Sequence, residues 1–321
     1  MRIKPILLLA AGTLACVLLQ FSVAHAIISV VGNSTSTPNN TSDPQPPLSG
    51  IPGWNNVGTV NGASGIYVGN GWVLTADHVG AGNFTLEVTT PNGTASGSTS
   101  TTTYNWNGIA PIRLTNTDGS GVADLVMFQV TSIPTGVSNL NVASTSPLAG
   151  TAFYNIGYGL EQNTAEEYFN YNSSTQTFTQ TTNPSAAYQG FGYGSPNTKS
   201  WGQNSIVGFQ SYNIGFGNVN AFYSTFTTST DQIVSGDSGG GVFNAAGELI
   251  GVNDAIGEYP NQPADTAFIN DQSDLINIAP FYSQITQISG IPEPSALALL
   301  TAAGAGILLL GRRRAARTHS I

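Results

Sequence analysis

Short apolar runs separated by turn residues recur along most of this 321-residue chain and limit what it can fold into. The runs are rich in β-branched and aromatic residues and are bounded by Gly, Asn or Asp, which is typical of β-strands. The best candidates are Ile66–Val68, Trp72–Thr75, Phe84–Thr89, Leu125–Val130, Ala152–Ile156, Ser205–Gln210, Gly241–Phe243, Leu249–Asn253 and Thr266–Ile269. Helical periodicity is nearly absent before Ile278–Ile288, where one short helix is expected. The pattern predicts an all-β protein, either a sandwich or barrels.

Composition divides the chain around this β-rich region. Residues 27–50 are rich in Pro, Ser, Thr and Asn and are interpreted as a linker. The folded domain is expected over 51–290. Within it, residues 161–204 are strongly polar and are interpreted as a long surface insertion between two strands.

The first 26 residues have the three parts of a secretory signal. Arg2 and Lys4 give the positive start, an apolar run covers 6–21, and a small-x-small motif predicts cleavage after Ala26. The alternatives are an uncleaved anchor or a lipid attached to Cys16, whose flanking residues fit lipidation poorly. Since Cys16 is the only cysteine, the exported protein is expected to have no disulfide.

The C-terminal residues 291–321 contain a second targeting pattern. A Pro-Glu-Pro motif at 292–294 precedes a short apolar stretch, Ala296–Leu310, which four arginines follow. This order resembles the PEP-CTERM sorting signal of Gram-negative bacteria. The resemblance implies a short transmembrane segment, processing by an exosortase-type membrane enzyme, and a final location at the cell envelope or outer surface, or secretion after processing. The alternative is a plain C-terminal anchor.

Charge excludes several classes of partner. Only Arg113 and Lys199 are basic between residues 27 and 290, whereas every acidic residue except Glu293 lies there. Nucleic acid and anionic membrane surfaces are therefore poor partners for the folded domain. One histidine and no cysteine in the exported part are too few ligands for zinc, so no metal is expected.

Ser238 lies in the run 235–240, Ser-Gly-Asp-Ser-Gly-Gly, which can present a hydroxyl beside uncovered backbone N–H groups. A serine nucleophile needs a base, and His78 is the only histidine outside the end segments. The imidazole needs a carboxylate to fix its tautomer. Asp124 heads an apolar strand and is the preferred candidate. Asp77 adjoins His78, but adjacent side chains on a strand point to opposite faces.

Three segments together resemble the trypsin-like, chymotrypsin-fold serine proteases. They are Trp72–His78, Asp124–Phe128 and Gly236–Gly240, in the family's order of His, Asp and Ser. The resemblance covers about residues 54–288. It implies two six-stranded antiparallel β-barrels with the site between them, a polypeptide substrate and no cofactor.

The resemblance also assigns roles. It makes Ser238 the nucleophile, His78 the general base and acid, and Asp124 the orienting carboxylate. The N–H groups of Gly236 and Ser238 would form the oxyanion hole. A second set of positions, Gln232, Ile233 and Asp254, would line the specificity pocket, and none supports a preference for Lys or Arg substrates.

Asp237 is the residue that the resemblance leaves open. In the family this acid pairs with an N-terminal amine created by cleavage, and an unpaired buried acid is costly. Cleavage after Ala26 would expose Ile27, and its amine is one candidate partner.

The expected function is an exported serine endopeptidase that works through an acyl-enzyme. The alternatives are a catalytically silent protease-fold module that binds at the cell surface, and an esterase with the same triad.

Overall fold

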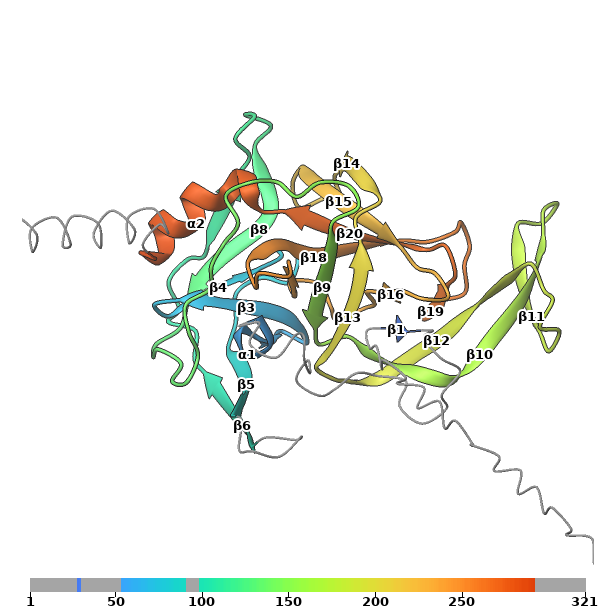
Figure 1. The fold of residues 1–321 in the computed structure, drawn as a ribbon, viewed down its shortest axis with the longest axis horizontal. Helices are drawn as coiled ribbons and strands as arrows, with labels where there is room; N and C mark the ends of the chain where they lie inside the picture. The colour runs from blue at the N-terminus through green and yellow to red at the C-terminus, as the bar shows by residue number, and fades with distance from the viewer. Residues whose placement is uncertain (1–27, 30–52, 91–97, 292–321) are drawn as a thin grey trace, which may run out of the picture.

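The computed structural model describes residues 28–29, 53–90 and 98–291. One antiparallel sheet of seven strands holds the first half of this chain (Figure 1). In spatial order its strands are β6 (Ser98–Tyr104), β5 (Phe84–Thr90), β2 (Val57–Val60), β3 (Ala63–Gly69), β4 (Trp72–Thr75), β8 (Val122–Gln129) and β7 (Ile112–Thr115). The short helix α1 (Gly53–Asn56) leads into it.

A second seven-stranded antiparallel sheet holds most of the other half. Its strands, in spatial order, are β13 (Ser200–Ser205), β9 (Ala152–Gly157), β17 (Gly241–Phe243), β18 (Leu249–Gly257), β20 (Gln272–Asn277), β15 (Val219–Thr225) and β14 (Gly208–Tyr212). Ile66 and Met127 of the first sheet share one buried cluster with Val252 and Ile276 of the second. The two sheets therefore pack on a common core.

The mostly β architecture with two antiparallel sheets is confirmed, but each sheet has seven strands where six were expected. Two of the edge strands are β7, which pairs only with β8, and β14, which pairs only with β15. Three of the four β7 residues are exposed, so an apolar pattern gave no sign of this strand. The strand expected at Ser205–Gln210 is wrong as one unit, because the chain leaves β13 at Ser205 and begins β14 at Gly208.

The polar insertion is a surface feature made of strands. β10 (Leu160–Asn172), β11 (Thr177–Thr181) and β12 (Tyr188–Asn197) form a four-stranded sheet with β19 (Thr266–Phe268). Figure 1 shows β10 and β11 reaching away from the two larger sheets. Aromatic rings hold this arm together, as in the 4.9 Å contact between the ring centroids of Phe169 and Phe268.

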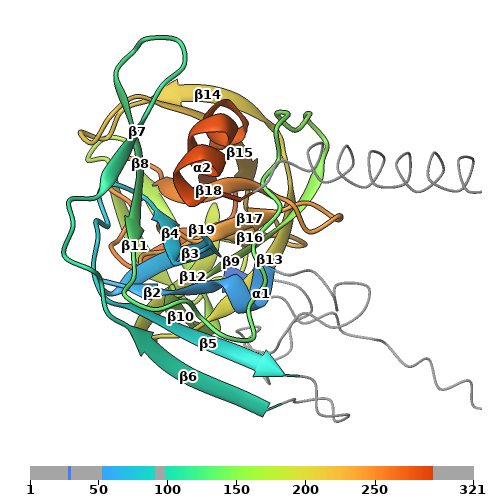
Figure 2. The ribbon, with the colours of Figure 1, turned by 90° about the vertical axis from the view of Figure 1, so that its left-hand side faces the viewer.

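The C-terminal helix is confirmed. A 3₁₀ turn η1 (Ala279–Phe281) leads into α2 (Tyr282–Ser289), which ends at Gly290 in the left-handed conformation that commonly terminates helices. The Gln284 side chain donates to Thr115 O of β7 at 2.7 Å. The helix therefore lies against the first sheet, beside β7 and β8 (Figure 2).

A two-stranded sheet joins β1 (Ile28–Ser29) to β16 (Asp231–Gln232). The expected signal peptide, the linker apart from β1, and the tail beyond residue 291 lie outside the described residues. Within the part of the chain that the structure describes, no helix has the length and apolarity needed to cross a membrane.

Candidate active site

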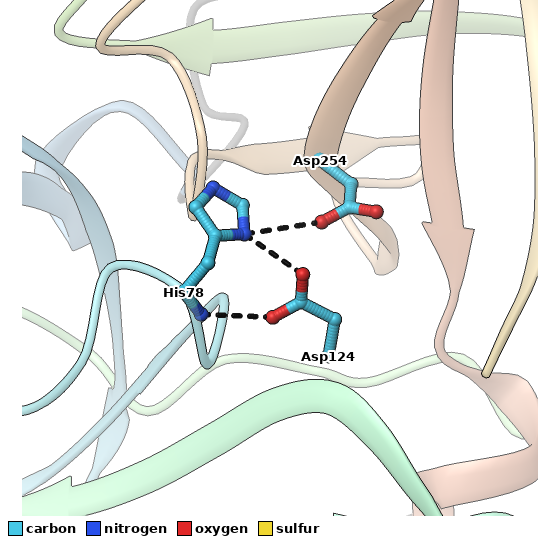
Figure 3. Close-up of side chains that lie close together, drawn as sticks. All are labelled: His78, Asp124 and Asp254. Atoms are coloured by element: carbon cyan, nitrogen blue, oxygen red, sulfur yellow. Dashed lines mark hydrogen bonds and ion pairs between the residues drawn. The ribbon is translucent and has the colours of Figure 1, made fainter. Parts of the chain in front are cut away.

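His78 and Asp124 are brought together by the pairing of β4 with β8. The register places Thr75 opposite Val126, so the turn that follows β4 meets the start of β8. His78 Nδ1 lies 2.8 Å from Asp124 Oδ2, and the His78 backbone N–H donates to Asp124 Oδ1 at 2.9 Å (Figure 3). A carboxylate only accepts, so Nδ1 carries the hydrogen and Nε2 is left as the basic nitrogen. The predicted pair is confirmed.

The surroundings of His78 strengthen it as a base. Its side chain is 20% exposed, and burial alone would lower its pKa. The hydrogen bond to Asp124 and the charge on that carboxylate, with smaller contributions from the acids Asp254 and Asp77, outweigh burial and raise the pKa above 6.5. The imidazolium that would form during proton transfer is thus stabilised where it arises.

Asp77 does not compete for the imidazole. Its Oδ2 lies 2.8 Å from an Arg113 guanidinium nitrogen, and the same guanidinium donates to the carbonyl of Phe216. The Phe216 ring lies 5.7 Å from the His78 ring, between centroids. Asp124, and not Asp77, is therefore the acid hydrogen-bonded to the imidazole, and Arg113 joins Asp77 to the segment that carries Phe216.

Ser238 lies in the loop between β16 and β17, where Gly236 (φ 96°) and Gly239 (φ 81°) take conformations that favour glycine. The Ser238 hydroxyl donates to the backbone carbonyl of Asp254 at 3.1 Å. The side chain of Asp254 in turn places Oδ1 3.7 Å from His78 Nδ1. Ser238 and His78 therefore adjoin the same residue, while the role of Ser238 as nucleophile stays a prediction.

The loop leaves two N–H groups uncovered. The N–H groups of Asp237, Gly239 and Gly240 each donate to a backbone carbonyl. Those of Gly236 and Ser238 have no acceptor among the described residues. This is the arrangement that an oxyanion hole requires, because its donors must be free for the ligand.

Ser64 of β3 connects the first sheet to this loop. Its hydroxyl donates to Gly236 O and accepts from the N–H of Tyr158, both at 2.8 Å. Its backbone N–H donates to Ser238 O at 2.9 Å. Ser64 is fully buried, so these bonds are shielded from water and fix the loop against β3.

Asp237 is fully buried. The Val234 N–H donates to its Oδ2 at 2.9 Å, and the Gly159 N–H also bonds to the carboxyl group. Burial outweighs both hydrogen bonds and raises the pKa of Asp237 to about 7. Among the described residues no cation pairs with Asp237, so the question raised by the sequence persists in the structure.

The three residues expected to line a specificity pocket lie in different surroundings. Gln232 is fully buried, donates to Gln272 O at 3.0 Å and accepts from Ser273 Oγ at 3.1 Å. Ile233 packs in the core of the second sheet. Asp254 instead lies beside His78. A role for these residues in substrate selection stays a prediction.

Sequence reasoning missed what Asp254 and Tyr212 do. The Tyr212 hydroxyl donates to Asp254 Oδ2 at 2.6 Å; Asp254 is buried beside His78, and Tyr212 is partly buried. One signal was present in the sequence: Asp254, like Asp124, is an acid within an apolar strand. The neighbour that such an acid meets depends on how the two sheets pack.

His78, Asp124 and Asp254 are the one group of at least three potential metal-ligating residues found in the described ranges, with ligand atoms within 4.8 Å of one another. A histidine nitrogen must be unprotonated to bind a metal. Here Nδ1 faces Asp124 at hydrogen-bond distance. Nδ1 therefore holds a proton that it shares with Asp124, and it is not available as a metal ligand in this arrangement.

Comparison with known proteins gave one family. A model of the trypsin-like peptidase domain matches residues 63–252. No curated protein matches the sequence. Among solved structures, a mutant of human heparin binding protein matches with 13% identity and a TM-score of 0.47, covering 76% of this chain and 95% of its own.

Proposed function

The chain belongs to the trypsin-like peptidase family, and we propose that it is an exported serine endopeptidase that hydrolyses peptide bonds through an acyl-enzyme. One observation carries the proposal: the buried carboxylate of Asp124 holds His78 by two hydrogen bonds, one to the ring nitrogen Nδ1 and one to the backbone N–H. That arrangement leaves Nε2 available as a base.

In the proposed reaction Ser238 Oγ leaves the carbonyl of Asp254, turns toward His78 and gives its proton to Nε2. The oxygen attacks the substrate carbonyl, and the free N–H groups of Gly236 and Ser238 bind the oxyanion. Protonated His78 then gives the proton to the leaving amine, and water hydrolyses the acyl-enzyme by the same steps. Asp124 stabilises the imidazolium throughout.

The proposed location is outside the cytoplasm. It rests on the secretory pattern of the first 26 residues and on the Pro-Glu-Pro, apolar and arginine-rich tail. We infer that an exosortase-type enzyme processes this tail, which tethers the protein to the membrane until then. Intact mass of the exported protein tests this inference. A mass that includes the terminal arginines in a fully exported protein would contradict processing.

The experiment for the activity is digestion of a peptide library by the purified exported protein, with Ser238→Ala as control. Cleavage by the wild type and none by Ser238→Ala supports an endopeptidase, and the cut sites give its specificity.

The alternative is a silent binding module. It is favoured by the resting hydrogen bond of Ser238 to Asp254 O rather than to the imidazole. A folded wild-type protein that cleaves nothing would support it.

A further inference from the structure

Two buried carboxyl groups flank a single imidazole. The side chains of Asp124 and Asp254 have no exposed surface. Asp254 Oδ1 lies 3.7 Å from His78 Nδ1, and Asp124 Oδ2 lies 2.8 Å from the same nitrogen (Figure 3). Like charges this close cannot both ionise cheaply in a dry interior, so such pairs commonly share a proton.

The hydrogen bonds of Asp254 leave one oxygen available to carry a proton. Oδ2 accepts from the Tyr212 hydroxyl at 2.6 Å. Oδ1 is buried and accepts no hydrogen bond from a described residue. A protonated Oδ1 would act as a donor, and the acceptor beside it is the carboxylate of Asp124, since the two residues have carboxyl oxygens within 4.8 Å of each other.

Where the structure describes the chain, His78 is the only cationic group that pairs with Asp254. From β20, Asp274 adds a further acid, which is held by two glutamine side chains. From the His78 side, Asp77 is paired with Arg113. Only His78 therefore remains to balance both Asp124 and Asp254 among the described residues.

We propose that Asp254 holds a proton at neutral pH and donates a hydrogen bond through it to Asp124, so that a carboxylic acid–carboxylate pair lies beside His78. This inference rests on the proposed function, and Asp254 acts in it as a positioning residue. Its donated hydrogen bond stabilises the Asp124 anion. With its charge stabilised in this way, Asp124 orients the Nδ1–H of His78 without removing the proton.

The electrostatics of the site agree with this assignment. Burial and the negative charge of Asp124 raise the pKa of Asp254 to about 7, against the opposing effects of the Tyr212 hydrogen bond and the charge of His78. When Asp254 loses its proton at higher pH, two carboxylates face each other and the donor to Asp124 is lost. The activity is therefore expected to fall on the alkaline side as Asp254 ionises.

The direct test is infrared spectroscopy of the resting, purified exported protein, which needs no turnover. We expect the wild-type spectrum minus the Asp254→Asn spectrum to contain a carboxylic-acid carbonyl band below the Asp254 pKa of about 7. The band should disappear as the pH rises. Asp237 and Asp271 also have raised pKa values, but their bands cancel in the difference. Absence of the band between the ordinary Asp pKa of 3.8 and the raised value of about 7 would overturn the proposal, whether or not the protein is a peptidase.

The second test is the pH dependence of kcat/KM. Asp254→Asn should lower kcat by about tenfold with KM unchanged, because an amide is a weaker donor to a carboxylate than an acid. The alkaline limb should vanish, while the acid limb set by His78 stays in place. A downward shift of the acid limb by one pH unit or more would show that Asp254 is charged, and would overturn the proposal.

Tyr212→Phe is the matched variant. It removes the hydrogen bond that lowers the Asp254 pKa, so the alkaline limb should move to higher pH and the infrared band should persist there. If Asp254→Asn fails to fold, this variant still decides the question. An alkaline limb that stays unmoved in Tyr212→Phe would contradict the assignment to Asp254.

Discussion

The hydroxyl of Ser64 donates to the carbonyl oxygen of Gly236 at 2.8 Å, and this bond joins the first sheet to the loop that carries Ser238. The histidine and aspartate of the site come from the first sheet, whereas the serine loop follows β16 and leads into the second sheet. Their relative placement therefore depends on contacts between the sheets, and Ser64 makes several of them.

Ser64→Ala is expected to destabilise the protein by about 1–3 kcal/mol, because it leaves the buried Tyr158 N–H without its acceptor. Reaction at Ser238 should slow as the loop loosens. Denaturant unfolding measures the first effect and hydrolysis the second. The control is Ser144→Ala at an exposed position, which should change stability by less than about 0.5 kcal/mol. Equal stability of the two variants would refute the role of Ser64.

Gly239 is expected to tolerate no side chain. It has a φ of 81°, and a Cβ there would overlap Ser64 O and Thr75 Oγ1. Gly119 has nearly the same φ, 79°, but a Cβ there meets nothing within 4 Å. Gly119→Ala should thus cost only the backbone strain of about 1–2 kcal/mol. Gly239→Ala should lower the stability by more than Gly119→Ala and should abolish hydrolysis. Thermal unfolding of the two variants separates the effect of backbone strain, which both share, from that of the overlap, which only Gly239→Ala has. Equal losses would show that the close contacts are unimportant.

Asp124→Asn is expected to lower kcat/KM by about 10⁴-fold, as loss of the orienting carboxylate does in this type of triad. Asp77→Asn is the matched control and should lower it less than tenfold, because Asp77 binds Arg113 and not the imidazole. Steady-state kinetics on one peptide substrate measures both. Comparable losses would mean that the two acids have been assigned wrongly.

The pH dependence follows from the same contacts. His78 must be neutral to accept a proton, and its pKa is raised above 6.5. The wild-type kcat/KM should therefore fall as the pH drops through a value above 6.5. An acid limb centred below that value would contradict the environment described for His78.

The amine of the signal-cleaved chain is expected to stabilise Asp237. The antiparallel register of Ile28 with Gln232 puts the start of β1 at the end of β16 that leads to Val234, the donor to Asp237. Ile27 itself lies outside the described residues. Acetylation of the mature amine tests the idea. A Lys199→Arg background leaves that amine as the only one, since Lys4 is removed with the signal.

Without the amine, Asp237 makes the stability of the protein depend on pH. The pKa of Asp237 without an amine is raised from 3.8 to about 7, so the folded state holds a proton that the unfolded state releases. Stability is then lost as the pH rises from about 4 through about 7. Between about pH 4 and about pH 7, the stability of the acetylated protein should fall increasingly below that of the protein with a free amine. The acetylated protein should also lose activity. A capped protein that stays fully active would sink the hypothesis.

The sequence predicted those parts of the fold that local pattern controls. The strands Trp72–Thr75 and Gly241–Phe243 were predicted at their observed bounds, since mostly buried apolar residues define both. The arm of β10, β11 and β12 was not, because its strands are polar and find their partners only in one another and in β19.

In the candidate active site, too, local pattern predicted some residues and not others. His78 and Asp124 were found because a motif and a buried strand start mark them. Asp254 was placed in a pocket, and its position beside His78 depends on packing between sheets that no local pattern reports. An acid within an apolar strand was the only sign of it.

The most direct test of the account is labelling of the purified exported protein with a fluorophosphonate probe, read by mass spectrometry. The probe reacts rapidly with a serine that a base activates, because an ordinary serine hydroxyl is a weak nucleophile. We predict one label per chain on Ser238, and none in Ser238→Ala or at any other serine. A correctly folded wild-type protein that takes up no label would contradict the catalytic assignment of His78, Asp124 and Ser238.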